Sequence, residues 1–151
     1  MKIRYTMLTI VLVISLSLVM TAGYASADEH GMPQSLSIED TDMVVGFDRP
    51  SVGWAKANEQ GQIIGYRGIC LLLGYSEKRY FEPLKMGEFN PYWGFGTASL
   101  IMPFVEVGGD YPFARRDDGS FFTVGGALAV HTYWETPYLI PLPRISISYH
   151  F

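Results

Sequence analysis

The carboxyl-terminal stretch Pro143-Arg144-Ile145-Ser146-Ile147-Ser148-Tyr149-His150-Phe151 alternates between apolar and polar residues up to its last position. Successive side chains of a β-strand point to opposite faces, so a strand here has one apolar face and one polar face. The apolar face holds Ile145, Ile147, Tyr149 and Phe151, and the polar face holds Arg144, Ser146, Ser148 and His150. The stretch therefore predicts an amphipathic strand that ends on an aromatic residue.

Such a strand needs a partner along each edge, because a bare edge is a template for pairing with other chains. A closed barrel in a membrane supplies both partners, with lipid against the apolar face and the lumen against the polar face. We therefore expect the rest of the chain to complete a small, all-β, antiparallel up-and-down transmembrane barrel.

The amino terminus has the three parts of a secretory signal peptide. Lys2 and Arg4 precede a mostly apolar run from Met7 to Met20, and Ala25-Ser26-Ala27 is a small-residue cleavage site. The run is shorter than the ~20 residues of a membrane-spanning helix, which favours cleavage over a retained anchor. Residues 1–27 are therefore predicted to be a signal peptide that is removed.

The mature chain would have 124 residues (151 less 27), enough for one domain. Without Lys2 and Arg4 it has 9 basic and 15 acidic residues, a net charge of −6, which argues against binding of nucleic acid. The single cysteine, Cys70, excludes an internal disulfide framework. No later apolar run reaches the length of a spanning helix, so any crossing of a membrane would use strands.

Six stretches have the composition of strands, and the number rises to eight if the ambiguous ones split. They are residues 43–47, 51–57, 62–75, 89–107, 120–134 and 143–151. The stretches 76–88, 108–119 and 135–142 are predicted to be connections. A single strand over 89–107 would exceed the 9–11 residues that span a bilayer, so we expect it to protrude or to split between Ser99 and Pro103. The barrel domain is predicted to cover residues 42–151, after a flexible segment at 28–41 for which a small plug is the alternative.

The stretch from Ser120 to Trp134 predicts a narrow barrel. Its large apolar residues share one face, whereas the other face is mostly small or polar, which suits a lumen with little room. The first face holds Phe122, Val124, Leu128, Val130 and Trp134; the second holds Phe121, Thr123, Gly125, Ala127, Ala129, His131 and Tyr133. Aromatic residues at both ends are typical of the girdles at membrane interfaces.

Together with the signal peptide, the final strand resembles that of small outer-membrane β-barrel proteins of Gram-negative bacteria. Members of this group end in Phe with apolar or aromatic residues at alternate positions before it, here Phe151, Tyr149, Ile147, Ile145 and, less well, Pro143. The resemblance implies an outer-membrane location, contact with outer-membrane lipids, and recognition of this strand by the barrel-assembly machinery. It implies no particular activity, and it leaves homo-oligomerisation open.

Arg67, Glu106, His131 and Arg144 are the polar residues that we expect inside the barrel, where charges must pair or meet water. Side chains fill the interior of a barrel of six to eight strands, so these charges predict a structural plug rather than a conducting pore. The three histidines and one cysteine lack the spacing of a metal site. No phosphate-binding glycine loop precedes a helix, and no cofactor is predicted.

Some small outer-membrane barrels are enzymes, such as lipid A deacylases and palmitoyltransferases, and an acyl hydrolase needs a nucleophile beside an oriented base. The residue types for such a site are present as His131, Ser146, Ser148, His150 and Glu106. The chain lacks G-x-S-x-G and the same-strand His–Ser pair of the deacylases. We therefore favour a non-enzymatic role in envelope structure, anchoring or surface interaction. The alternatives are a barrel enzyme that acts on lipid acyl chains and a soluble periplasmic β-barrel or sandwich that binds an apolar ligand.

Overall fold

The computed structural model describes residues 34–70, 73–99, 101–133 and 136–151. The predicted signal peptide and residues 28–33 of the predicted flexible segment lie outside the described residues. Within these four ranges, no helix is long and apolar enough to cross a membrane.

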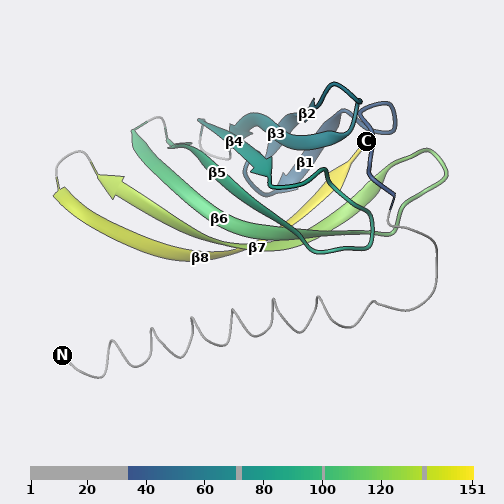
Figure 1. Cartoon of the computed structure of the whole chain (residues 1–151). Coiled ribbons are helices and arrows are strands. Elements are labelled where there is room, and N and C mark those ends of the chain that lie inside the picture. The colour runs from purple at the N-terminus through teal and green to yellow at the C-terminus, as the bar shows by residue number, and fades with distance from the viewer. Residues whose placement is uncertain (1–33, 71–72, 100, 134–135) are drawn as a thin grey trace. The chain divides into compact units, whose positions relative to one another are not determined.

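In the described residues, eight strands form one closed antiparallel barrel, in which each strand pairs with its neighbours in sequence and the last pairs with the first (Figure 1). They are β1 (Met43–Phe47), β2 (Val52–Ala57), β3 (Ile63–Cys70), β4 (Gly74–Tyr80), β5 (Asn90–Ala98), β6 (Met102–Phe113), β7 (Phe121–Tyr133) and β8 (Thr136–His150). The predicted small up-and-down barrel is therefore confirmed, with a strand number at the upper end of the predicted six to eight.

The carboxyl-terminal strand closes this barrel. Phe151 and Met43 exchange two backbone hydrogen bonds, each 3.0 Å long, and Val44 lies opposite His150. The predicted alternation along β8 is also confirmed. Its buried residues include Ser146, Ser148 and His150, its exposed residues include Ile145 and Ile147, and Phe151, which follows the strand, is also exposed.

Three of the predicted connections contain strand instead. β4 occupies the first part of 76–88, β6 extends through Phe113 into 108–119, and β8 begins at Thr136 within 135–142. For 76–88 and 108–119 the prediction was wrong because charge, proline and glycine were taken as marks of a loop, whereas Lys78 and Asp110 point into the barrel and are buried. The predicted strand 62–75 is divided between β3 and β4, and 89–107 is divided between β5, which ends at Ala98, and β6, which begins at Met102; a split here was one of the two expected outcomes.

The register of the strands gives the tilt of the wall. We follow the paired residues once round the barrel, from each strand to the next. The path starts at His150 on β8 and comes back to β8 at Ile140, ten residues earlier in the chain. The residues on this path are His150, Val44, Gly53, Gly68, Ser76, Gly96, Phe104, His131 and Ile140. Ten residues at about 3.4 Å, over eight strands about 4.8 Å apart, tilt the strands by roughly 40° from the barrel axis.

The wall is uneven in height. β1 to β4 have 5, 6, 8 and 7 residues, whereas β5 to β8 have 9, 12, 13 and 15. At this tilt the first group rises roughly 13–20 Å and β6 to β8 rise roughly 30 Å or more. Figure 1 shows β7 and β8 extending past the other strands at the end away from the carboxyl terminus.

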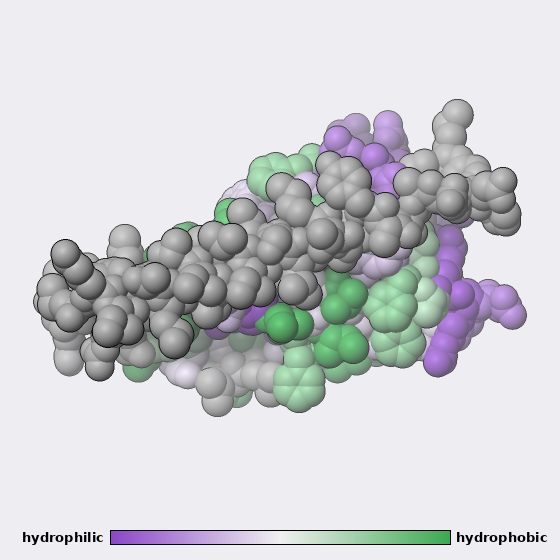
Figure 2. All heavy atoms as spheres, turned by 90° about the horizontal axis from the view of Figure 1, so that it is seen from below, coloured by the Kyte–Doolittle hydropathy of each residue, from purple (hydrophilic) through white to green (hydrophobic). Residues whose placement is uncertain are grey.

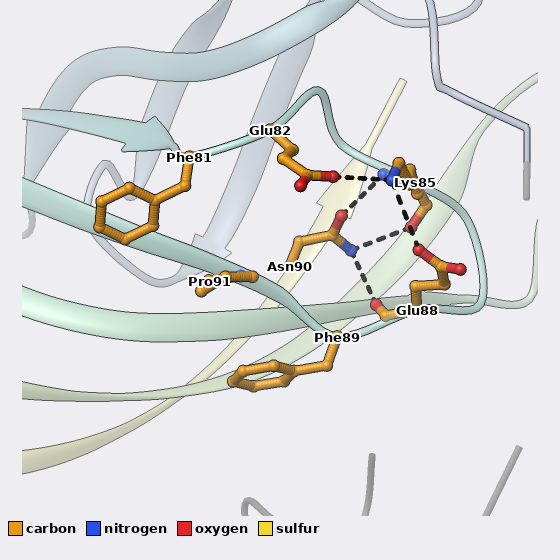
Figure 3. Close-up of a pocket in the computed structure, with 7 residues that line it drawn as sticks. All are labelled: Phe81, Glu82, Lys85, Glu88, Phe89, Asn90 and Pro91. Carbon is orange, nitrogen blue, oxygen red and sulfur yellow. Dashed lines mark hydrogen bonds and ion pairs between the residues drawn. The ribbon is translucent and has the colours of Figure 1, made fainter. Parts of the chain in front are cut away.

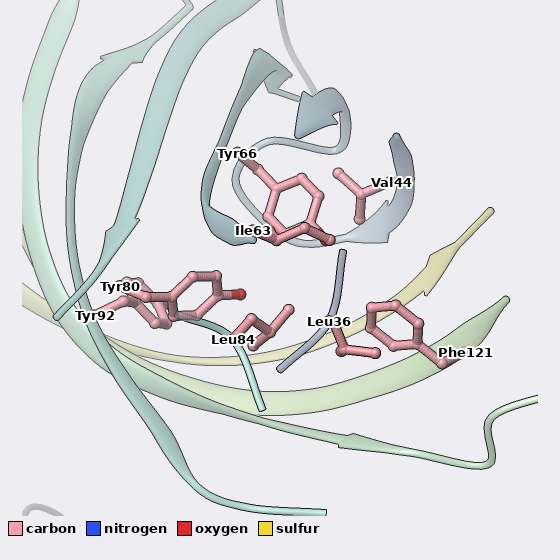
Figure 4. Close-up of a cluster of buried hydrophobic side chains, with 8 residues drawn as sticks. All are labelled: Leu36, Val44, Ile63, Tyr66, Tyr80, Leu84, Tyr92 and Phe121. Carbon is pink, nitrogen blue, oxygen red and sulfur yellow. The ribbon is translucent and has the colours of Figure 1, made fainter. Parts of the chain in front are cut away.

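The end of the barrel that holds the carboxyl terminus is closed by an apolar cluster (Figure 4). Its members are Leu36, Val44, Ile63, Tyr66, Tyr80, Leu84, Tyr92 and Phe121. Leu36 is fully buried; its N–H donates to Leu84 O at 2.8 Å, and its carbonyl accepts from Ile63 N–H at 2.9 Å. Leu36, in the described part of the predicted flexible segment, is therefore packed into the barrel end.

Leu36→Ala tests this closure. We expect it to lower the free energy of unfolding by about 2–5 kcal/mol, because it leaves a cavity in the apolar cluster. Ile38→Ala is the control, since Ile38 comes from the same segment but is 36% exposed. Equilibrium unfolding in urea measures both variants, and equal losses would show that Leu36 does not hold the segment in place.

Candidate functional site

The lumen holds a compact network of charged side chains. β4, β6 and β8 contribute Lys78, Glu106, Asp110 and Arg144 from their inward faces, and the β1–β2 turn adds Asp48 and Arg49. The network thus contains three cations and three anions and is formally neutral. It gathers residues that lie up to 96 positions apart in the chain.

Lys78 lies at the centre of one half of this network. Its ammonium group pairs with Asp110 at 2.8 Å and with Asp48 at a short distance. Tyr80 donates its hydroxyl hydrogen to Asp110 at 2.7 Å, and the Lys78 ammonium lies 4.2 Å from the centre of the Tyr92 ring. The lysine charge is therefore surrounded by carboxylates and an aromatic face instead of water.

Arg144 links that half to the other. Its Nη1 lies 3.0 Å from Asp48 Oδ1, and its Nη2 lies 3.1 Å from both carboxylate oxygens of Glu106. Arg49 is more loosely held, with Nη1 3.7 Å from Glu106 Oε2 and its guanidinium 4.1 Å from the centre of the Phe104 ring. A continuous series of ion pairs therefore connects Asp110, which accepts the hydrogen bond from Tyr80, to Arg49 in the β1–β2 turn.

Glycines on the inward faces make room for these carboxylates. At Gly94 an added Cβ would lie 3.1 Å from Glu106 Cγ, and at Gly125 it would overlap Asp110 Oδ1. Gly125, one of the small inward residues predicted on β7, thus leaves space for the Asp110 side chain of the neighbouring strand β6.

The predicted lumen residues are placed as follows. Glu106 and Arg144 belong to the network, and His131 is buried beside it, with Nε2 3.3 Å from Arg49 Nη1. Arg67 is a correction: it is exposed on the outer face of β3, opposite Trp54 and Glu77. Both faces of that stretch are partly apolar, so the sequence pattern could not decide which one is inside.

Four members of the network were missed: Lys78 and Asp110 fall in stretches predicted as connections, and Asp48 and Arg49 lie between two predicted strands, just before Pro50. The signal that could have found Lys78 is the alternation on β4, whose small or polar inward residues are Gly74, Ser76, Lys78 and Tyr80. Asp48 carries no comparable signal, because a turn residue reaches the lumen only through the path of the backbone.

The two described lumen histidines do not contact the serines that a hydrolase would need. His131 faces Arg49 and the Phe104 ring, whereas His150 bonds Tyr66 at 2.9 Å and Thr123 at 3.0 Å. Ser148 donates to Asp48. The base and nucleophile of the acyl-hydrolase alternative are therefore not brought together by these contacts.

A shallow pocket of about 200 Å³ lies under the β4–β5 loop (Figure 3). Asn90 braces this loop by bonding the backbone of Lys85 and Glu88, and Lys85 pairs with Glu82 at 2.8 Å. That contact lowers the pKa of the Glu82 carboxyl and raises the pKa of Lys85. These polar groups bind one another, which indicates a bracing role for the loop.

In the described part of the chain, no group of three or more histidine, cysteine or acidic residues could hold a metal ion. The chain matches no protein-family model, and no curated protein or solved structure is significantly similar to it. Its function must therefore follow from its own geometry.

Lys78→Met tests whether the network holds the barrel together. We expect a loss of about 3–5 kcal/mol in the free energy of unfolding, because two buried carboxylates lose their shared cation. Adding Asp110→Asn should recover part of that loss, since it removes one of the stranded charges.

The control for this pair is Lys85→Met, which removes a loop lysine and should leave the urea unfolding curve unchanged. A Lys78→Met protein as stable as the parent would mean that the network contributes nothing to folding.

Proposed function

We propose that this protein is a small outer-membrane β-barrel that serves as an envelope anchor or surface-interaction element and does not conduct. The observation that carries the proposal is the division of β5 to β8 between a charged interior and an uncharged exterior. Along the described residues of these strands, outward positions are apolar, aromatic, glycine, proline or threonine, without a charge. Val105, Val107, Ile145 and Ile147 are more than half exposed.

The lengths of these four strands support insertion in a bilayer. A transmembrane strand needs about 9–11 residues, and β5 to β8 meet that length. Figure 2 shows hydrophobic side chains over the wall and hydrophilic ones at the end drawn on the right, which in Figure 1 carries the β6–β7 loop. An apolar wall above a polar rim is the distribution that a membrane barrel requires.

The outer face of the short strands is more polar. Glu77 accepts from Lys56 at 2.7 Å and from Arg79 at 2.6 Å, and Arg67 lies beside it. Such charges are costly near the middle of a bilayer but not at its interface. They therefore favour a position of this part of the wall at the level of the lipid headgroups.

The filled lumen favours an anchoring role over a pore or a carrier of apolar ligands. The central charges pair across the interior, and an apolar cluster closes the end beside the carboxyl terminus. The lumen contains ion pairs instead of an apolar cavity, which argues against the alternative of a soluble barrel that binds an apolar ligand. Outer-membrane lipids and the barrel-assembly machinery, which would read Ile145, Ile147, Tyr149 and Phe151, are the partners that this proposal implies.

Val107→Arg tests the membrane location. An arginine on the lipid-facing wall should cost about 2–4 kcal/mol if it lies near the bilayer midplane. We expect less protein in the outer-membrane fraction and less of the compact form that migrates faster on an unheated gel. Gln60→Arg, in the β2–β3 loop, adds the same charge and should change neither. Recovery of the parent chain in the soluble periplasmic fraction would refute the proposal.

Phe151→Ser tests the assembly signal. We expect a several-fold lower level of assembled barrel in cells, because the machinery would no longer recognise the last strand. Phe113→Ser, at the end of β6, removes a similarly exposed aromatic residue outside that strand and is the control. Equal effects of both substitutions on the outer-membrane level would mean that Phe151 acts only through general stability.

A further inference from the structure

The barrel wall is interrupted between β1 and β8. β1 ends at Phe47, opposite Ile147, whereas β8 continues back to Thr136. From Ser146 to Thr136, no strand in the described ranges pairs with the edge of β8 that faces β1. The long strand therefore borders an opening in the side of the barrel.

The sequence of β8 is adapted to this free edge. Phe151 donates its N–H toward β1, and N–H directions alternate along a strand, so Tyr149, Ile147 and each second residue before them also face that side. Pro143 and Pro141 occupy two of these positions, and proline has no N–H to leave unpaired. Prolines on an edge also prevent pairing with a further strand. The opening therefore disfavours strand exchange with a second copy.

A cavity of about 290 Å³ lies at this opening. Its polar lining includes the side chains of Arg49, Arg144 and Asp48, so that two cations face one anion. The two arginine side chains are 18% and 19% exposed, whereas those of Asp48 and Glu106 are 5% and 1% exposed. The charge presented to the cavity is therefore mainly positive, although the network behind it is neutral.

Arg49 is the residue best able to accept another partner. Its ion pair with Glu106 is 3.7 Å long, which is beyond hydrogen-bond distance, and Arg144 binds that carboxylate at 3.1 Å through both oxygens. Arg49 can thus turn toward an anion in the cavity without leaving Glu106 unpaired, in exchange for its contacts with His131 Nε2 and the Phe104 ring. A planar guanidinium suits the oxygens of a phosphate group.

The same cavity also has an apolar lining. Phe47 and Ile145 are 73% and 83% exposed, whereas Cys70 and Ala98 are buried. A volume of about 290 Å³ lies at the lower limit for small-molecule sites, so it suits a polar headgroup and not long hydrocarbon chains. A ligand that matches both parts has an anionic head and apolar chains that remain outside the wall.

We propose that this lateral opening binds the phosphate headgroup of an anionic phospholipid. Arg49 and Arg144 hold the phosphate, and the acyl chains lie along Phe47, Ile145 and the free edge of β8. The inference rests on the proposed insertion in a membrane. It adds one specific lipid-binding site to a barrel whose other lipid contacts are non-specific.

Native mass spectrometry of the full chain, extracted in detergent from a Gram-negative host, tests the site. The probes are phosphatidylglycerol, phosphatidylcholine and inorganic phosphate. We expect one retained phosphatidylglycerol, bound at least about tenfold more tightly than phosphatidylcholine, and little competition from inorganic phosphate at equal concentration. Equal retention of the two lipids would overturn the proposal. Displacement by inorganic phosphate at concentrations equal to the lipid would overturn it in favour of a free-phosphate site.

Arg49→Gln should weaken the binding of phosphatidylglycerol about tenfold, because it removes one charge-assisted contact. Arg116→Gln, in the β6–β7 loop, removes the same charge and should have no effect. If Arg49→Gln does not fold, Phe47→Ala keeps the test valid, since Phe47 is exposed and its loss should weaken retention several-fold. Unchanged affinity in the folded variant would overturn the site, whereas a chain that never enters the membrane would overturn the proposed function itself.

Discussion

The pairing of Lys78 with Asp48 and Asp110 is the interaction on which the rest of this barrel depends. A buried ammonium group is tolerated only if carboxylates replace its water, and a buried carboxylate has the same need. The two aspartates come from the β1–β2 turn and from β6, so their shared partner connects opposite sides of the lumen. Arg144 then extends the pairing to Glu106 and β8. A narrow, filled interior follows, and with it the exclusion of a wide channel.

The uneven wall is the second constraint on function. The strands on one side are long enough for a bilayer and carry no outward charge in their described residues, while those on the other side are short and present Lys56, Glu77 and Arg79. In the proposed membrane location, a barrel of this shape would not meet the bilayer equally all the way round. Its opening lies where the shortest strand, β1, meets the longest, β8, and this step in height brings arginines of the network close to the surface.

Much of the fold could be predicted from periodicity. The alternation on 120–134 and 143–151 predicted two of the strands and their inward faces, and the length of 89–107 predicted that it would either protrude or split. The prediction failed where interior charges resembled loop residues, at Lys78 and Asp110, and where two half-apolar faces were equivalent, at Arg67. Charge by itself does not say whether a side chain meets water or a partner from another strand.

The sequence by itself determined that the chain forms amphipathic strands with an apolar face and a small, polar face, because a period of two is a local property of the backbone. Only the tertiary structure decided the number of strands, the register between them and the partners of each buried charge. That register shifts the chain by ten residues over one turn of the barrel. These depend on contacts between residues distant in the chain, such as Asp48 and Arg144. Closing the barrel in one register brings these two residues together.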